Sequence, residues 1–368
     1  MKERGKILLY INSISRYNYG NLHSNLQLME GFIEKGFDVV FVVNKRTPDD
    51  VNVPVRVVEL QAKGDFDRPF KLAKVIREEN PTAVISNMYV QILTTALAKR
   101  FLGENRPKLI GVCRDVRNWH RRWWKLPFRL FVKKVFESMD WMVAISESVK
   151  RDMRKTFFVK EDKIKLIYNP VNVEKIRKLS EEPIEEDSFF RERQVLCVVG
   201  RLEEQKAPEV ALSIFELLKE KLNNVGLCFV GSGSMERRLI AEVEDKALTK
   251  DVLFTGFQEN PFKYIAKSKL LLHTAVREGL GRVVMESLAL GVPVVALYNE
   301  HSGYRELLHK SGGGILVPHG KTDEAVKKIK EILSNEELYF SLKDKALKSI
   351  ELFDRKRIIG RYINLLGR

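Results

Sequence analysis

The sequence predicts an α/β fold with two parallel sheets, each doubly wound by helices on both faces. Its 368 residues are enough for two domains with separate hydrophobic cores. Short apolar runs alternate with stretches of helical length, which is the pattern of strand–helix–strand units. This alternation occurs twice, once on each side of the acidic, proline-containing stretch Leu179–Asp187, which we interpret as a linker.

In the first half of the chain, a strand, a loop and a helix are expected in that order. The strand is Ile7–Asn12, the loop is Ser13–Gly20, and the helix runs from about Asn21 to Lys35, because Gly36 then stops it. Further apolar runs predict strands at 38–43, 83–86, 109–112 and 141–145. Residues 1–175 are therefore expected to form an N-terminal domain.

The second half repeats this order, from a strand at Gln194–Gly200 to a helix at 208–221 that begins with Pro208. Proline suits a first helical turn because its missing N–H would have no partner there. Further strands are predicted at 226–230, 252–255, 269–272 and 293–297. We assign residues 176–351 to a C-terminal domain. The end of a long amphipathic helix, 342–366, is expected to return to the first domain over about 352–368.

The composition is typical of a globular protein of the cytoplasm. Hydrophobic residues make up 44% of the chain and charged residues 31%, and no apolar run reaches the roughly 18–20 residues that a membrane span needs. Cys113, Cys197 and Cys228 are scattered in strand-like segments, which argues against disulfides and zinc and for a reducing compartment. The six histidines show no metal-binding spacing, so no metal cofactor is expected.

The net charge of +15 is concentrated between residues 101 and 160, which contain 15 Lys and Arg against 6 Asp and Glu. Such an excess indicates an anionic partner. Its centre is an aromatic and basic patch: Trp119, Arg121, Arg122, Trp123, Trp124 and Lys125. Tryptophan and basic residues favour an anionic membrane interface, so a peripheral membrane contact and ordinary core packing of the aromatics are both open. No nucleic-acid partner is expected, because no recognition motif accompanies the charge.

The most informative segment is Glu278–Glu286, in which two carboxylates flank a glycine-containing turn at the start of a helix. Glycines let the backbone approach a ligand closely, and the free N–H groups of a helix start suit a phosphate. Glu286 falls on an apolar stretch, so its charge needs a partner, and sugar or ribose hydroxyls are suitable. Either glutamate alone would be read as structural, whereas the whole string favours a binding site.

Three further motifs follow predicted strands of the same half. Gly200-Arg201 and Lys206 place two cations on a loop that opens a helix, which suits a diphosphate. Gly231-Ser232-Gly233 offers backbone N–H groups to a nucleotide or sugar, and Gly256-Phe257 lies where a base could stack. One such motif alone indicates only a turn. Four in order predict a single phosphate-binding pocket.

With these motifs the chain resembles the nucleotide-sugar-dependent glycosyltransferases of family 4, which have the GT-B fold. The resemblance covers nearly the whole length and includes Gly291-Val292-Pro293, Glu306, Val143–Glu147 and Tyr168–Asn172. It implies two Rossmann-like domains facing each other across a cleft, with the acceptor on the first and the nucleotide sugar on the second. It also implies retention of anomeric configuration without a metal, and without a protein nucleophile, because the donor diphosphate helps to deprotonate the acceptor.

The resemblance further implies roles for individual residues. Arg201 and Lys206 would hold the diphosphate, while Glu278 would bind hydroxyls of the transferred sugar and Glu286 those of the ribose. The residues implied in catalysis are Glu278, Arg114, Lys206 and Arg201. The residues implied in donor binding are Gly20, Asn21, Gly200, Arg201, Lys206, Gly231, Gly233, Gly256, Phe257, Glu278, Gly279, Leu280, Gly281, Arg282, Val283 and Glu286.

Two positions depart from the family pattern. Many relatives have two adjacent glycines in the first loop, whereas Gly20 is followed here by Asn21. Many have a histidine after the central strand of the first domain, where this chain has Arg114. A subgroup acting on lipid-linked or surface-polysaccharide intermediates is similar at this point, which gives Arg114 a contact with donor or acceptor. An ion pair with Asp115 is the structural alternative.

We therefore predict a retaining glycosyltransferase that moves a hexose or N-acetylhexosamine from a UDP- or GDP-sugar to a glycan acceptor. The acceptor is expected to be lipid-linked, which places a cytoplasmic enzyme at the inner face of the cell membrane, in polysaccharide or glycolipid biosynthesis. A transferase with a free sugar acceptor is the enzymatic alternative and predicts no membrane affinity. A sugar-nucleotide- or polyanion-binding protein without activity is the other.

Overall fold

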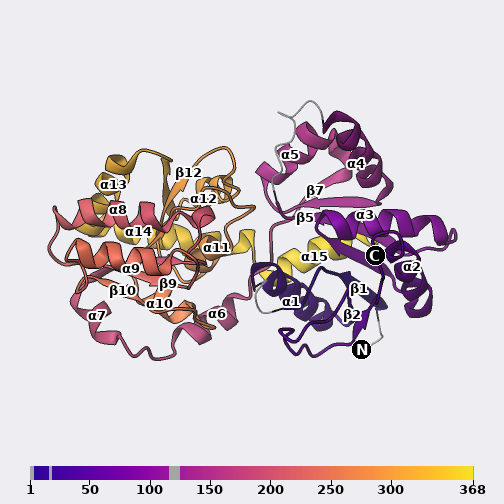
Figure 1. The fold of residues 1–368 in the computed structure, drawn as a ribbon, viewed down its shortest axis with the longest axis horizontal. Helices are drawn as coiled ribbons and strands as arrows, with labels where there is room; N and C mark the ends of the chain where they lie inside the picture. Colours follow the sequence, from indigo (N-terminus) through magenta and orange to yellow (C-terminus); the bar gives the residue numbers. More distant parts are fainter. Residues whose placement is uncertain (1–3, 16–18, 116–124, 368) are drawn as a thin grey trace. The chain divides into compact units, whose positions relative to one another are not determined.

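The computed structural model describes residues 4–15, 19–115 and 125–367. The chain divides into two compact units, the first formed by Met1–Val171 with Arg355–Arg368 and the second by Asn172–Asp354 (Figure 1). The sequence placed these boundaries at 175/176 and about 351/352. Each unit has one parallel sheet with helices packed on both faces, which confirms the predicted class of two Rossmann-like α/β units.

The first unit contains a seven-stranded sheet in the order β3-β2-β1-β4-β5-β6-β7. Its strands are β1 (Lys6–Tyr10), β2 (Asp38–Val43), β3 (Val57–Glu59), β4 (Ala83–Asn87), β5 (Lys108–Cys113), β6 (Trp141–Ala144) and β7 (Ile164–Leu166). In the centre, Leu8 lies opposite Val40 on one side and Val84 on the other, and all three are buried. Such strands are apolar throughout because helices cover both faces of the sheet.

The helices of the first unit form two layers. They are α1 (Tyr19–Glu34), α2 (Arg68–Glu79), α3 (Tyr89–Ala98), α4 (Leu126–Ser138), α5 (Glu147–Phe157) and α15 (Arg355–Leu365). Helices α2, α3, α4 and α5 pack in sequence along one layer, whereas α1 packs with α15. Helix α5 begins at Ser146, whose side chain accepts a hydrogen bond from the N–H of Val149 and so caps the helix.

The second unit contains a six-stranded sheet in the order β10-β9-β8-β11-β12-β13. Its strands are β8 (Gln194–Val199), β9 (Val225–Val230), β10 (Val252–Phe254), β11 (Leu270–His273), β12 (Val294–Tyr298) and β13 (Gly314–Pro318). The order reverses between β8 and β11, which lie side by side in the sheet. Ligands of doubly wound sheets bind at such a switch point.

The helices of the second unit are α6 (Val173–Ser180), α7 (Asp187–Glu192), α8 (Pro208–Lys219), α9 (Glu236–Asp245), α10 (Phe262–Lys267), α11 (Arg282–Ala289), α12 (Arg305–Ser311), α13 (Thr322–Ser334) and α14 (Glu336–Lys348). Helix α8 packs with α9 and α13, whereas α11 packs with α6, α10 and α14. No helix within the described ranges is long and apolar enough to cross a bilayer.

The stretch Leu179–Asp187 is not the linker that the sequence indicated. It lies inside the second unit, where α10 and the residues before it hold it. Asn260 donates a hydrogen bond of 2.7 Å to the carbonyl of Leu179, and Lys267 lies 2.5 Å from the carboxylate of Asp187. Acidic, proline-containing stretches are usual in linkers, but here the acids have basic and polar partners on α10.

The long last helix predicted at 342–366 is interrupted. Helix α14 ends at Lys348, a 3₁₀ turn covers Ser349–Leu352, and α15 begins at Arg355. The chain passes from the second unit to the first at this break. Phe353 is fully buried within it. The apolar periodicity continues across the break, so the pattern contained no sign of it.

Candidate active site

The loops that follow β8 and β11 meet at the switch point of the second sheet. Nζ of Lys206 lies 2.9 Å from Oε1 of Glu278, and Nε2 of His273 lies 2.8 Å from Oε2 of the same carboxylate. Lys206 ends a short 3₁₀ turn before α8, and the Thr274 hydroxyl donates 2.8 Å to its carbonyl. The switch point therefore carries a carboxylate between two basic side chains.

Glu278 is held in its ionised form by these neighbours. Burial would raise the pKa of its carboxyl, but the charge and hydrogen bond of Lys206, together with the nearby His273 imidazole, outweigh burial and bring the pKa well below its usual range. The His273 contact is close but is not aligned as a hydrogen bond. A carboxylate fixed in this way can accept hydrogen bonds from hydroxyl groups.

The backbone around Glu278 is fixed by the loop that follows β12. The Glu278 N–H donates 3.2 Å to the carbonyl of His301, and the Gly303 N–H donates 2.9 Å to the carbonyl of Glu278. A Cβ on Gly303 would lie only 1.7 Å from the carbonyl oxygen of Gly279. Glycine at this position is thus a packing requirement of the Glu278 loop.

Helix α11 starts directly after this loop. Gly281 precedes it with φ at +75°, a conformation that favours glycine, and Leu280 and Val283 are buried on either side. Glu286 is buried one turn further on, where Nε of Arg282 lies 2.5 Å from its Oε1. Burial raises the pKa of Glu286, although Arg282 counteracts part of this. Arg282 is therefore the partner that the charge of Glu286 needs within the free chain.

Glycines let the loops after β8, β9 and β10 approach one another. The Gly231 N–H donates 2.8 Å to the carbonyl of Gly256, and a Cβ on Gly231 would lie 2.0 Å from the carbonyl oxygen of Gly200. A Cβ on Gly233 would lie 2.4 Å from the carbonyl oxygen of Leu202. These predicted donor-binding glycines thus have a structural reason within the chain itself.

Two predicted donor-binding side chains at these loops are exposed. Phe257, just after Gly256, has 58% of its surface accessible. Arg201 is exposed and lines a cavity of about 750 Å³ with Glu203, Ser234 and Arg238 among others. The Glu203 carboxylate accepts a 2.8 Å hydrogen bond from Ser234 in that cavity, so it fixes the turn after β9.

Arg114 belongs to the first unit, at the carboxyl end of β5, and is buried. Its guanidinium donates to amide oxygens: Asn87 at 3.0 Å, Asn169 at 2.5 Å and Asn25 at 3.5 Å. A guanidinium held in one orientation by amides suits a positioning or binding role. Gly20 and Asn21 lie in the first turn of α1. Among the patch residues, only Lys125 is described, since Trp119, Arg121, Arg122, Trp123 and Trp124 lie outside the described residues.

The structure adds His273 and Tyr304 to the site, which sequence reasoning missed. The Tyr304 ring packs edge-on against the His273 ring with centroids 4.6 Å apart. The Tyr304 hydroxyl donates to the carbonyls of Ala275 and Leu297, at 3.1 and 2.5 Å. A usable signal for His273 existed, because it ends a buried strand five residues before Glu278. The loop that brings Tyr304 to the same place has no such signal.

Two Rossmann-like units in one chain form the architecture of the GT-B glycosyltransferases. The family model described as Glycosyltransferase Family 4 matches residues 23–175, and the model described as Glycosyl transferases group 1 matches residues 180–349. The chain belongs to these glycosyltransferases, and the resemblance read from its motifs is confirmed.

Individual relatives agree with this assignment. The chain is 26% identical over 288 residues to an uncharacterized glycosyltransferase of Methanocaldococcus jannaschii, covering 76% of this chain and 68% of the relative. It is 27% identical over 265 residues to a 4-alpha-N-acetylgalactosaminyltransferase of Campylobacter jejuni, covering 72% of this chain and 70% of the relative. The crystal structure of Anabaena HepE with UDP has the same fold, with a TM-score of 0.82 at 18% identity, covering 98% of this chain and 99% of HepE.

Proposed function

We propose that this glycosyltransferase transfers a hexose or N-acetylhexosamine from a nucleotide diphosphate sugar with retention of anomeric configuration and without a metal. The observation that carries the proposal is the Lys206–Glu278 pair at the switch point between β8 and β11. An ammonium group suits a diphosphate, and a carboxylate suits sugar hydroxyls. Their contact at 2.9 Å supports the proposal, because one nucleotide sugar could reach both groups.

The free chain pairs these two groups with each other, and the donor would replace that pairing. The diphosphate would draw the Lys206 ammonium, while Glu278, still beside His273, would accept hydrogen bonds from the sugar. Arg201 and the N–H groups of Gly281–Val283 would add positive potential for the phosphates. The bond from the anomeric carbon to the diphosphate would break as the acceptor oxygen bonds on the same face. The acceptor proton would pass to the leaving diphosphate.

We propose a UDP- or GDP-sugar as donor and a lipid-linked glycan as acceptor, with the enzyme acting at the cytoplasmic face of the membrane. Two likenesses support this. The Campylobacter jejuni relative is named for an acceptor sugar carried on diphospho-undecaprenol, and the HepE structure contains UDP. UDP-sugars are therefore the first donors to test.

A thermal-shift screen with UDP, GDP, ADP and their common sugar conjugates, without metal, tests the donor proposal. A ligand present at 100 times its dissociation constant should stabilise the native protein by about 2.7 kcal/mol. A clear preference for one nucleotide, followed by transfer from its sugar conjugate to a lipid diphosphate glycan, is the expected result. If no nucleotide shifted the melting temperature, the result would count against a donor site and favour a degenerate binding protein. The same conclusion would follow if all nucleotides gave the same shift.

A further inference from the structure

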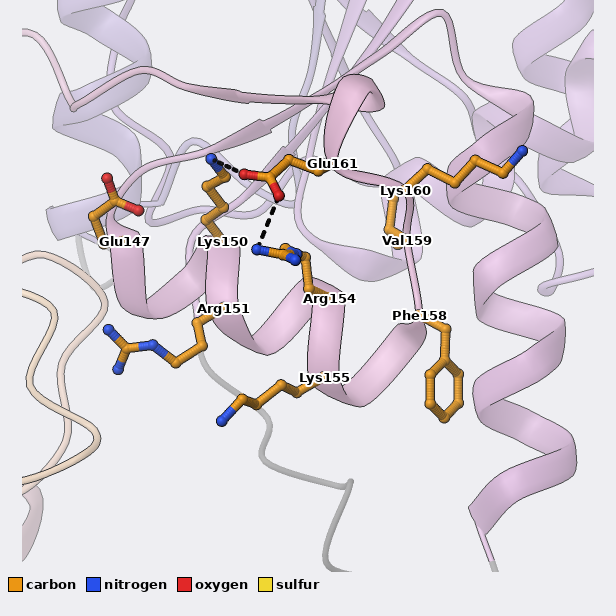
Figure 2. A pocket seen from close by; sticks show the side chains of 9 residues that line it. All are labelled: Glu147, Lys150, Arg151, Arg154, Lys155, Phe158, Val159, Lys160 and Glu161. Atoms are coloured by element: carbon orange, nitrogen blue, oxygen red, sulfur yellow. Dashed lines mark ion pairs between the residues drawn. The ribbon is translucent and has the colours of Figure 1, made fainter.

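A cavity of about 580 Å³ lies along helix α5 in the first unit, and its lining is mainly cationic. The residues that line it are Glu147, Lys150, Arg151, Arg154, Lys155, Phe158, Val159, Lys160 and Glu161 (Figure 2). The proposed transfer reaction uses none of them. Five cations against two acids give the cavity a positive potential that needs its own explanation.

Three of these cations share one face of α5 with an aromatic side chain. Arg151, Arg154, Lys155 and Phe158 are spaced as i, i+3, i+4 and i+7, and all four are exposed. In Figure 2, Arg151, Lys155 and Phe158 extend from the same side of the helix. This face presents charge and an apolar ring together.

Glu161, which also lines the cavity, does not cancel the positive charge of this face. Glu161 lies 2.9 Å from Lys150 and 3.0 Å from Arg154. One carboxylate shared by two cations cannot neutralise both, and exposed pairs of this kind are weak. Glu161 therefore orients part of the basic face and leaves it cationic.

Phe158 is held in a conformation that costs the fold free energy. Its φ is +54°, in the left-handed region that glycine or asparagine normally occupies at a helix end, and 40% of its surface is exposed. Its N–H closes α5 by donating 3.1 Å to the carbonyl of Arg154. Glycine or asparagine would adopt this conformation at less cost, so the Phe158 side chain must be retained for the contacts that its ring makes.

Helix α4, which packs against α5, also exposes apolar side chains. Its buried Arg129 donates 2.6 Å to the carbonyl of Thr156 and stacks 4.6 Å above the Phe158 ring, so α4 contacts the end of α5 through this side chain. The other side of α4 exposes four large apolar residues, between 43% and 47% accessible: Leu126, Phe128, Leu130 and Phe131.

We propose that this α4–α5 surface, formed by Arg151, Arg154, Lys155, Phe158 and the four exposed apolar residues of α4, docks on an anionic phospholipid bilayer. The cations would lie at lipid phosphates, and the aromatic and aliphatic side chains at the boundary between headgroups and acyl chains. A free phosphate compound would leave the apolar residues unused. Nucleic acid would stack on aromatics but offers nothing to Leu126 and Leu130.

The purpose of this docking rests on the proposed lipid-linked acceptor, but its test needs neither donor nor acceptor. The full chain is sedimented with neutral phosphatidylcholine vesicles and with vesicles that also contain phosphatidylglycerol, at low and high salt. We expect binding to the anionic vesicles that weakens with salt. The double change Arg151→Gln and Lys155→Gln should weaken it about thirtyfold, since each basic residue near an anionic surface contributes about fivefold.

Two variants separate the apolar and the charged contributions. Phe158→Asn suits the left-handed conformation but loses the stacking of Arg129 on the ring, so the two effects oppose and the thermal stability should change little, while vesicle binding falls several-fold. The matched control is Lys327→Gln with Lys330→Gln, two exposed lysines on α13 of the second unit. The proposal would be overturned if the control variant lost as much vesicle binding as the α5 variant, or if the chain bound neutral vesicles alone. It would also be overturned if the chain bound a single-stranded oligonucleotide but not the vesicles. Donor binding, followed by thermal shift, should remain in every variant, which keeps this result separate from the proposed transfer.

Discussion

His273 and Glu278 are close neighbours at the carboxyl end of β11, with Nε2 of the imidazole 2.8 Å from Oε2 of the carboxylate. The imidazole is buried and packs against Tyr304, whose hydroxyl is fixed by two backbone carbonyls. Tyr304, His273 and Glu278 therefore form a chain of contacts that ends at the proposed sugar-binding carboxylate. His273 is a positioning residue in this arrangement.

Replacing His273 by Ala should lower kcat/KM for the donor by roughly fivefold to a hundredfold, because a buried polar group that loses its neighbour costs about 1–3 kcal/mol. His273→Gln, whose amide can donate to the same carboxylate, should recover part of this loss. His309→Ala removes an exposed histidine on α12 and serves as the control. Identical kinetics in the His273→Ala and His309→Ala enzymes would remove the positioning role.

Glu278→Gln should reduce transfer by at least about a hundredfold, as the loss of a charged transition-state contact does in other enzymes. Circular dichroism should show an unchanged fold, because the amide keeps the size and shape of the side chain. Full activity of the Glu278→Gln enzyme would contradict the role proposed for this carboxylate.

The same variant has a pH signature. The pKa of Glu278 is lowered in the folded chain, so its ionised form contributes stability above the ordinary glutamate pKa of about 4.3, and this is lost as pH falls through the lower folded value. The difference in unfolding free energy between wild type and Glu278→Gln should thus be constant near neutral pH and shrink in acid. Urea titrations of both proteins at several pH values measure this difference. A difference that grew in acid would contradict the lowered pKa of Glu278.

Glu286 should show the opposite behaviour. Burial raises its pKa, so the charged form costs stability at pH values above the folded pKa, and the cost disappears below about 4.3. Glu286→Gln is therefore expected to be as stable as wild type or more stable at neutral pH, while binding nucleotide more weakly. Urea titration and thermal shift with UDP measure the two effects. A less stable variant with unchanged nucleotide affinity would mean that Glu286 is purely structural.

Gly303→Ala tests the loop that holds Glu278. The added Cβ would lie 1.7 Å from the carbonyl oxygen of Gly279 and 3.0 Å from that of Glu278, so the loop must move. We expect donor affinity and activity to fall by about tenfold or more, since a displacement of about 1 Å at a reacting group can cost a hundredfold. Gly64→Ala, where a Cβ meets nothing within 4 Å, should leave both unchanged.

Much of the fold could be predicted from the sequence because its signals are local. Buried parallel strands such as β1 and β8 are continuous apolar runs, and the glycine motifs follow strand ends directly. Contacts between distant segments left no such signal. The strands β3, β7 and β13 were missed, as was the pairing of the stretch Leu179–Asp187 with α10, because both depend on tertiary neighbours.

The proposed site likewise has one part that the sequence predicts and one part that depends on contacts between distant segments. The approach of Lys206 to Glu278 follows from the topology, which places the loops after β8 and β11 side by side. The contribution of Tyr304 cannot be predicted from the topology. It depends on how the loop after β12 folds back, which a hydrogen bond from Gly303 to Glu278 fixes and no sequence pattern indicates.

Gly31 on α1 packs against the last helix, α15. A Cβ there would lie 2.4 Å from Cγ1 of Ile359, which is fully buried, and Arg355 pairs with Glu30 and Glu34 on either side. Gly31→Ala should therefore destabilise the chain by about 1–3 kcal/mol through overpacking.

Ile359→Ala alone should cost about 2–5 kcal/mol through the cavity that it leaves. The double variant should be more stable than the sum of the two losses, because the new methyl group partly fills that cavity. Urea unfolding of the four proteins measures the coupling, with Gly360→Ala, which meets nothing within 4 Å, as the control on the same helix. Strict additivity would show that α1 and α15 do not pack through Gly31.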